Sequence, residues 1–401
     1  MREWVLKNGL RLISVPKKCD SVTVHVLVDV GSNYEAPRIA GISHFIEHIV
    51  FEGTAKRATA REVAQEIERL GGEFNAYTTA ERTCFYAKVV KKHVDVALDV
   101  ISDILQRPLF RQEDVQRQRH IIFKEIDLVD DDPRAYQWIL FQKTLFAKHP
   151  SRNPTYGTKK AVLSTSAKDI KTYFSQYYVP SNMVLVVVGD VDGVREKCER
   201  AFDWRGHNVV HIRFTEPPQK EIRIKKEKKS VANSYVVVGH QTVPRAHPDS
   251  YVLEVIDGIL GRGQSGWMFD EIRNKAGLAY EVGTQHVAEK DYGFFATYAS
   301  VDKKNIPLVQ KLMHTQLERL KTASAQDVRD AQTYLEGDYV LEHEDTQKIA
   351  DGVAFWAQMG KAASYFDYIK QINKVAVRDV RRVAEKYFSR VCTVAVVEGK
   401  G

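Results

Sequence analysis

Two histidines and a glutamate stand close together in the first part of the chain, as His44, Glu47 and His48. On a helix, residues three and four apart lie one turn above each other on the same face. His44 and His48 could therefore each direct an imidazole nitrogen toward one metal ion. Glu47 would project to nearly the same side, where its carboxylate could take a proton from a water molecule. Zinc is the metal expected for imidazole and carboxylate ligands, with a fourth position open to water.

This spacing matches the HxxEH pattern, which reverses the HExxH motif of zinc metalloproteases. A five-residue match arises by chance in roughly one protein of several hundred, so it needs support from elsewhere in the chain. Two histidines on an otherwise apolar helix can also be hydrogen-bonded core residues. A third ligand and a segment that binds substrate would favour the metal site over this alternative.

Two segments together resemble the pitrilysin and mitochondrial-processing-peptidase family of zinc endopeptidases, in particular its short bacterial-type members. They are GISHFIEHIVFEGT at 41–54 and QRHIIFKEI at 118–126, and the resemblance covers nearly the whole chain. In that family a glutamate on a long helix completes the metal site. The resemblance therefore implies Glu125 as the third zinc ligand, with 76 residues between it and His48.

One position departs from the family pattern. Relatives usually carry a second glutamate two helical turns before the third ligand, where it supports the metal site, whereas this chain has Gln118. An amide accepts a hydrogen bond from an imidazole but brings no charge to raise the basicity of the ligand. Metal affinity or catalytic rate is therefore expected to be lower than in relatives, without loss of the metal.

A second resemblance concerns the binding of substrate. The segment GGEFNAYTTAERT at 71–83 corresponds to an edge strand that lies beside the zinc in relatives. An extended peptide can add to such an edge by main-chain hydrogen bonds, which suits a peptidase of broad specificity. By resemblance, Asn75 and Ala76 hold the peptide around the scissile bond.

The second half of the chain contains no HxxEH and is expected to be free of metal. Its segment FDEIRNKAGLAY at 269–280 resembles a family pattern in which an arginine and a tyrosine reach the active site of a facing half. Arg273 would hold the main chain of the substrate, and the Tyr280 hydroxyl would help to stabilise the oxyanion. Taken alone, Arg273 reads as a surface ion-pair residue and Tyr280 as a core aromatic.

The order of predicted elements occurs twice along the chain. Each half has strands mixed with helices, which indicates an α+β fold with helices packed on one face of a mainly antiparallel sheet. We therefore predict an internal duplication, with a zinc-binding catalytic domain at 1–205, a linker at 206–219 and a metal-free homologous domain at 220–401. The linker assignment follows from weak periodicity and from its glycine and prolines.

Composition excludes several classes of protein. With 401 residues, 44% hydrophobic and 28% charged, wholesale disorder is not expected. No run of 18 uncharged apolar residues predicts a membrane span. The net charge of +7 is modest, and the densest basic stretch, at 225–229, has no interleaved aromatic residues, so nucleic-acid binding is not predicted. Four widely spaced cysteines indicate a reducing compartment.

These observations together predict a zinc endopeptidase that carries one zinc per chain and acts on peptides or unfolded segments. Relatives with four such domains in one chain close into a chamber, so the resemblance implies a dimer, either of identical chains or with a zinc-less homologue. The alternative is a non-catalytic structural or partner subunit of a related peptidase or membrane complex. We expect a cytoplasmic protein, with a mature organelle-matrix form as the alternative.

Overall fold

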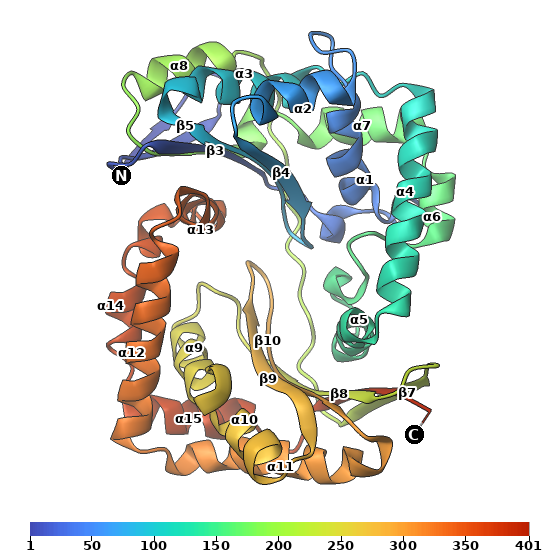
Figure 1. The fold of residues 1–401 in the computed structure, drawn as a ribbon, viewed down its shortest axis with the longest axis vertical. Helices are drawn as coiled ribbons and strands as arrows, with labels where there is room; N and C mark the ends of the chain where they lie inside the picture. The colour runs from blue at the N-terminus through green and yellow to red at the C-terminus, as the bar shows by residue number, and fades with distance from the viewer. Residues whose placement is uncertain (401) are drawn as a thin grey trace. The chain divides into compact units, whose positions relative to one another are not determined.

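The computed structural model describes residues 1–400, which belong to two compact units. The first unit comprises Met1–Ile126, Pro154–Ile212 and Leu341–Tyr365, and the second comprises Asp127–Asn153, Arg213–Val340 and the chain from Phe366 onward. Both units combine helices with a sheet, so the predicted α+β class is confirmed (Figure 1). No helix of residues 1–400 combines the length and the apolar character needed to cross a membrane.

The first unit is built on a six-stranded sheet of order β1-β2-β6-β3-β5-β4. Only the β2–β6 pair is parallel, and the other neighbours are antiparallel. Its last edge strand, β4, pairs only with β5 among the described strands, so one side of β4 is open. The strands are β1 (Arg2–Val5), β2 (Arg11–Val15), β3 (Ser21–Val28), β4 (Glu73–Thr78), β5 (Thr83–Val90) and β6 (Met183–Val188).

Most helices of the first unit pack on one face of this sheet around a large apolar core. Three of them begin at side-chain caps, because Thr59 accepts a hydrogen bond from Glu62 N, Thr158 accepts one from Ala161 N, and Ser166 forms a capping box with Asp169. The helices are α1 (Ile42–Ile49), α2 (Ala60–Glu68), α3 (Val94–Gln106), α4 (Gln112–Asp131), α6 (Lys159–Ser164), α7 (Ala167–Tyr177) and α8 (Val194–Ala201).

The opposite face of the same sheet is covered by one helix from far along the chain, α13 (Thr346–Gln358) (Figure 1). Its buried residues Ile349, Val353 and Ala357 pack against strand residues such as Ile13 and Val186. Burying these side chains against the β-strands removes apolar surface from water on a second face of the sheet.

The second unit repeats the topology of the first. Its sheet has the order β7-β11-β8-β10-β9, in which the last strand β11 lies between β7 and β8 as β6 lies between β2 and β3, and again forms the only parallel pair of its sheet. Recurrence of this unusual insertion supports the predicted internal duplication. The strands are β7 (Arg223–Lys228), β8 (Ser234–Gln241), β9 (Ala279–Ala288), β10 (Gly293–Val301) and β11 (Thr393–Glu398).

The helices of the second unit also divide between the two faces of its sheet. Most contribute to a core on one face, and α5 covers the other with Leu140, Phe141 and Leu145. The helix α5 begins at Asp132, whose side chain accepts from Arg134 N, and Pro133 occupies its first position. The helices are α5 (Pro133–Leu145), α9 (Asp249–Leu260), α10 (Trp267–Phe269), α11 (Ile306–Arg319), α12 (Ala325–Glu342), α14 (Tyr368–Ile372) and α15 (Val377–Tyr387).

The units differ from the predicted domains 1–205 and 220–401 in one respect. The predicted boundaries make each domain one continuous segment, whereas the units exchange residues 127–153 and 341–365. The exchange follows from packing, since α5 and α13 each bury an apolar face against the sheet of the other half of the sequence. The change of unit at Ile212 and Arg213 lies within the segment 206–219, which contains neither helix nor strand.

Candidate metal centre

The helix α1 presents two different faces. Ile42, Phe45, Ile46 and Ile49 are buried in the core, while His44, Glu47 and His48 lie on the other face. The helix begins at Gly41, whose φ of 97° is a left-handed conformation that favours glycine. A Cβ atom at Gly41 would lie 2.3 Å from Tyr156 O, so this position has no room for a side chain.

The first turn of α1 is held by a carboxylate. Glu35 accepts hydrogen bonds from the backbone of Gly41 at 2.5 Å and of Ser43 at 2.8 Å. These bonds satisfy two donors that the helix itself leaves unpaired. Burial raises the pKa of Glu35 to about 7, and the two backbone bonds oppose that rise.

Three side chains converge at the exposed face of α1. His44 Nε2 and His48 Nε2 are 3.3 Å apart, and they lie 3.6 Å and 3.4 Å from Glu125 Oε2 of α4. Ligands placed 2.0–2.1 Å from a tetrahedral zinc are about 3.3 Å from one another, so the three atoms have the spacing of three tetrahedral ligands. Glu125 Oε2 is also buried and has no hydrogen-bond partner among residues 1–400, which leaves it available to a metal.

The pKa of His44 and the hydrogen-bond partner of His48 both suit a metal. Burial, followed by the proximity of His48, lowers the pKa of His44 to about 3, so His44 is neutral near pH 7. His48 Nδ1 lies 3.1 Å from Gln118 Oε1 of α4. A carbonyl oxygen only accepts, so this contact requires the proton on Nδ1 and leaves the Nε2 lone pair facing His44 and Glu125.

Glu47 is oriented by a residue of the edge strand. Thr78 Oγ1 donates to Glu47 Oε2 at 2.6 Å. Burial raises the pKa of Glu47, while the Thr78 hydrogen bond and His48 oppose the rise and Glu125 adds to it. Thr78 was not among the site residues predicted from the sequence. The alternation of β4 was the available signal, because Ala76 and Thr78 are two apart and share one face of the strand.

The two residues predicted to bind substrate lie on the open edge strand. Asn75 Oδ1 accepts a hydrogen bond from Ala76 N at 2.8 Å, so this main-chain donor of the edge strand is already bonded to a side chain. Asn75 is exposed and Ala76 is partly buried. Their positions in β4 are compatible with the predicted strand addition, in which an incoming carbonyl would replace the Asn75 amide.

Arg273 and Tyr280 lie together in the second unit. Arg273 Nη1 donates to Tyr280 O at 2.8 Å, and its guanidinium is 4.8 Å from the centre of the Tyr280 ring. Phe269 contacts the same guanidinium at 4.7 Å. Tyr280 is 75% exposed, so it is a surface residue. The alternative interpretation of its sequence position, a core aromatic residue, is therefore wrong.

One other group of possible ligands converges within residues 1–400, and it also lies in the first unit. His25, Cys84 and Asp351 bring a nitrogen, a thiol and a carboxylate within 4.8 Å of one another. Burial alone would raise the pKa of Asp351, but its contacts with His25 and Tyr77 and the charge of Arg82 lower it. The positive charge of Arg82 already stabilises the Asp351 carboxylate, so no metal is needed for that purpose. We therefore interpret this cluster as a set of polar contacts that attaches α13 to the strands.

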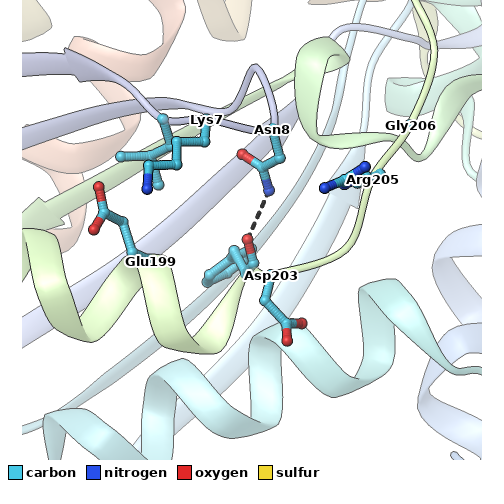
Figure 2. A pocket seen from close by; sticks show the side chains of 8 residues that line it. Lys7, Asn8, Glu199, Asp203, Arg205 and Gly206 are labelled. Carbon is cyan, nitrogen blue, oxygen red and sulfur yellow. Dashed lines mark hydrogen bonds between the residues drawn. The ribbon is translucent and has the colours of Figure 1, made fainter.

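A surface pocket of about 590 Å³ shares none of these residues. Figure 2 shows cationic and anionic side chains mixed around it, and Asn8 donates to Phe202 O at 2.7 Å. Because its lining carries charges of both signs, the pocket does not indicate one class of ligand. Its lining residues are Leu6, Lys7, Asn8, Glu199, Phe202, Asp203, Arg205 and Gly206.

Two family models match this chain and identify the family to which it belongs. Residues 11–159 match the family model described as Insulinase (Peptidase family M16), and residues 164–335 match that described as Peptidase M16 inactive domain. The chain belongs to the M16 peptidase family. The match to the first model includes His44, Glu47, His48 and Glu125, and that to the inactive-domain model includes Arg273 and Tyr280.

Individual members of the M16 family are similar over their full length. An uncharacterized zinc protease of Bacillus subtilis is 27% identical over 100% of this chain and 99% of its own. One of Rickettsia felis is 29% identical over 98% of this chain and 96% of its own. The crystal structure of a protease from Helicobacter pylori superposes with a TM-score of 0.94 at 25% identity, covering 99% of both chains.

Proposed function

We propose that this M16-family chain is a zinc metalloendopeptidase that hydrolyses bonds in peptides or unfolded segments. The observation that carries the proposal is the spacing of His44 Nε2, His48 Nε2 and Glu125 Oε2, with Glu47 beside them on the same helix face. These three residues would hold one zinc ion per chain. When bound, zinc would polarise the scissile carbonyl and lower the pKa of a water molecule in the site.

The residues of the chain supply the remaining steps. Thr78 holds the Glu47 carboxylate in place by the 2.6 Å hydrogen bond. Glu47 accepts the proton of the attacking water as general base and then returns it to the leaving amine. The open edge of β4 binds the substrate as an added strand. Ala76 N, which donates to Asn75 Oδ1 in the free chain, then donates to a carbonyl oxygen of the peptide.

Arg273 and Tyr280 complete the proposed site from a second chain. In a dimer of identical chains, or with a zinc-less homologue, the partner would present its arginine to the substrate main chain and its tyrosine to the oxyanion. The 75% exposure of Tyr280 in the isolated chain fits a residue that is covered by substrate or a partner. All four cysteines are free thiols, which fits a cytoplasmic location.

Removal of the metal tests the peptidase proposal. Dialysis against a zinc chelator should abolish cleavage of a quenched fluorescent peptide, and about one equivalent of zinc should restore it. Cleavage that persists in metal-free protein would contradict the proposal. The alternative, a non-catalytic subunit, predicts no cleavage in either state.

Mixing two inactive variants tests the donation of Arg273 between chains. Glu47→Gln removes the general base, and Arg273→Ala removes the donated guanidinium. After the two variants are mixed and exchanged, a mixed dimer has one site with both groups intact, so part of the activity should return. Mixed dimers that form without activity would contradict donation by a partner.

A further inference from the structure

A hydrogen-bonded chain runs outward from His48 through three side chains. His48 Nδ1 contacts Gln118 Oε1 at 3.1 Å, Gln118 Nε2 donates to Glu52 Oε1, and Arg117 Nη2 donates to Glu52 Oε2. Gln118 is 7% exposed and Glu52 is 9% exposed. The bond between Gln118 and Glu52 therefore lies largely out of water, where each hydrogen bond has a larger influence on its neighbours, whereas Arg117 is 52% exposed.

The elements of the fold bring these residues together. Glu52 lies four residues after His48, at the end of a 3₁₀ turn (Val50–Glu52) that continues α1. Gln118 comes from α4 and bridges the two. Arg117, the neighbour of Gln118, also donates to Asp114, and Arg111 pairs with Asp114 at 2.6 Å. Arg117 thus holds one oxygen of the Glu52 carboxylate, and Gln118 contacts the other.

The orientation of the amide is the critical point. A glutamine side chain can present either its oxygen or its NH₂ group to a given partner, whereas a carboxylate can only accept. Facing Glu52, Gln118 must direct its NH₂ group to the carboxylate and its oxygen to His48. Only with that orientation does His48 carry its proton on Nδ1 and keep the Nε2 lone pair for a metal.

We propose that Glu52 is a positioning residue, which fixes the orientation of Gln118 and through it the metal-binding tautomer of His48. This inference rests on the proposed zinc site. It also accounts for the glutamine at position 118, where relatives usually have a glutamate. The negative charge is still present in this chain, but it belongs to Glu52 and lies one hydrogen bond further from His48. Gln118 without Glu52 would have no fixed orientation.

An exchange of the two side chains tests the proposal. Glu52→Gln leaves two amides that can adopt either orientation, so the Kd for zinc should rise by about 10- to 100-fold. Gln118→Glu alone places two carboxylates in contact and should also weaken binding. The double variant Glu52→Gln/Gln118→Glu restores a single arrangement, because the amide now at position 52 donates to the carboxylate now at position 118. That carboxylate in turn accepts from His48, and the Kd should return to near the wild-type value.

The readout is the Kd for zinc, measured by competition with a coloured chelator, with thermal unfolding of the metal-free proteins alongside. Glu68→Gln is the matched control, since Glu68 is an exposed glutamate of α2 outside this network. Wild-type affinity in Glu52→Gln, or failure of the double variant to recover, would overturn the inference. Failure of the wild-type chain to bind zinc would instead contradict the proposed function, so the two failures are distinguishable.

Discussion

The hydrogen bond between Thr78 and Glu47 allows a quantitative prediction for the proposed peptidase. Thr78→Val keeps the shape of the side chain and the backbone of β4, but removes the donor that lies 2.6 Å from Glu47 Oε2. A hydrogen bond to a charged acceptor contributes about 1.5–3 kcal/mol. If the bond serves to hold the base in its reactive position, its loss should lower kcat by about 10- to 100-fold, since 1.4 kcal/mol corresponds to a factor of about ten.

The assay is steady-state cleavage of a fluorescent peptide by wild type, Thr78→Val and Thr78→Ser. KM should change little, because the side chain of Thr78 contacts Glu47 and leaves the strand edge unaltered. Thr78→Ser retains a hydroxyl and should keep most of the activity, and zinc content should be equal in all three proteins. An unchanged kcat in Thr78→Val, or equal losses in the valine and serine variants, would show that the Thr78 hydroxyl does not hold Glu47 in its reactive position.

Three further predictions concern stability. Phe141→Ala removes a fully buried ring of α5 and should cost about 3–5 kcal/mol of unfolding free energy in urea, whereas Leu128→Ala, at a side chain 69% exposed, should cost little. Equal effects would contradict the placement of α5. Burial lowers the pKa of His240 to about 4, so the stability it contributes is complete above pH 6.5 and falls by up to about 3 kcal/mol as the pH drops to 4. His240→Gln should flatten this dependence in urea titrations, and an unchanged slope would exclude His240 as its source. Gly41→Ala should lower both Tm and zinc affinity, since a Cβ there meets Tyr156 O at 2.3 Å, and normal values would exclude that conflict.

The sequence was sufficient for the repeated α+β architecture because the order of elements occurs twice. It was not sufficient for the exchange of α5 and α13. The spacing of Ile349, Val353 and Ala357 shows that a helix has an apolar face, but periodicity does not say which sheet that face covers. Such pairing is a tertiary property, decided by the fit of side chains that are distant in sequence.

The site shows the same limit at the level of single residues. His44, Glu47 and His48 were identifiable because their spacing has a meaning within one helix. Thr78 and Glu52 were not predicted, since each acts through a partner on another element: Thr78 through Glu47, and Glu52 through Gln118, 66 positions away. The alternation of β4 gives the face on which Thr78 lies, but it does not give the partner. From the sequence, Gln118 indicated a loss of negative charge near His48, because the sequence does not show that Glu52 contacts Gln118.

Zinc content and peptide turnover, measured together for wild type and Glu47→Gln, are the decisive test of the proposed zinc peptidase mechanism. We expect about one zinc per chain in both proteins, because Glu47 is not a proposed ligand, and turnover in the wild type alone. Turnover that survives in Glu47→Gln would contradict the assignment of the general base. A wild-type chain that holds no zinc and cleaves no peptide would contradict the proposed metallopeptidase and favour the non-catalytic subunit.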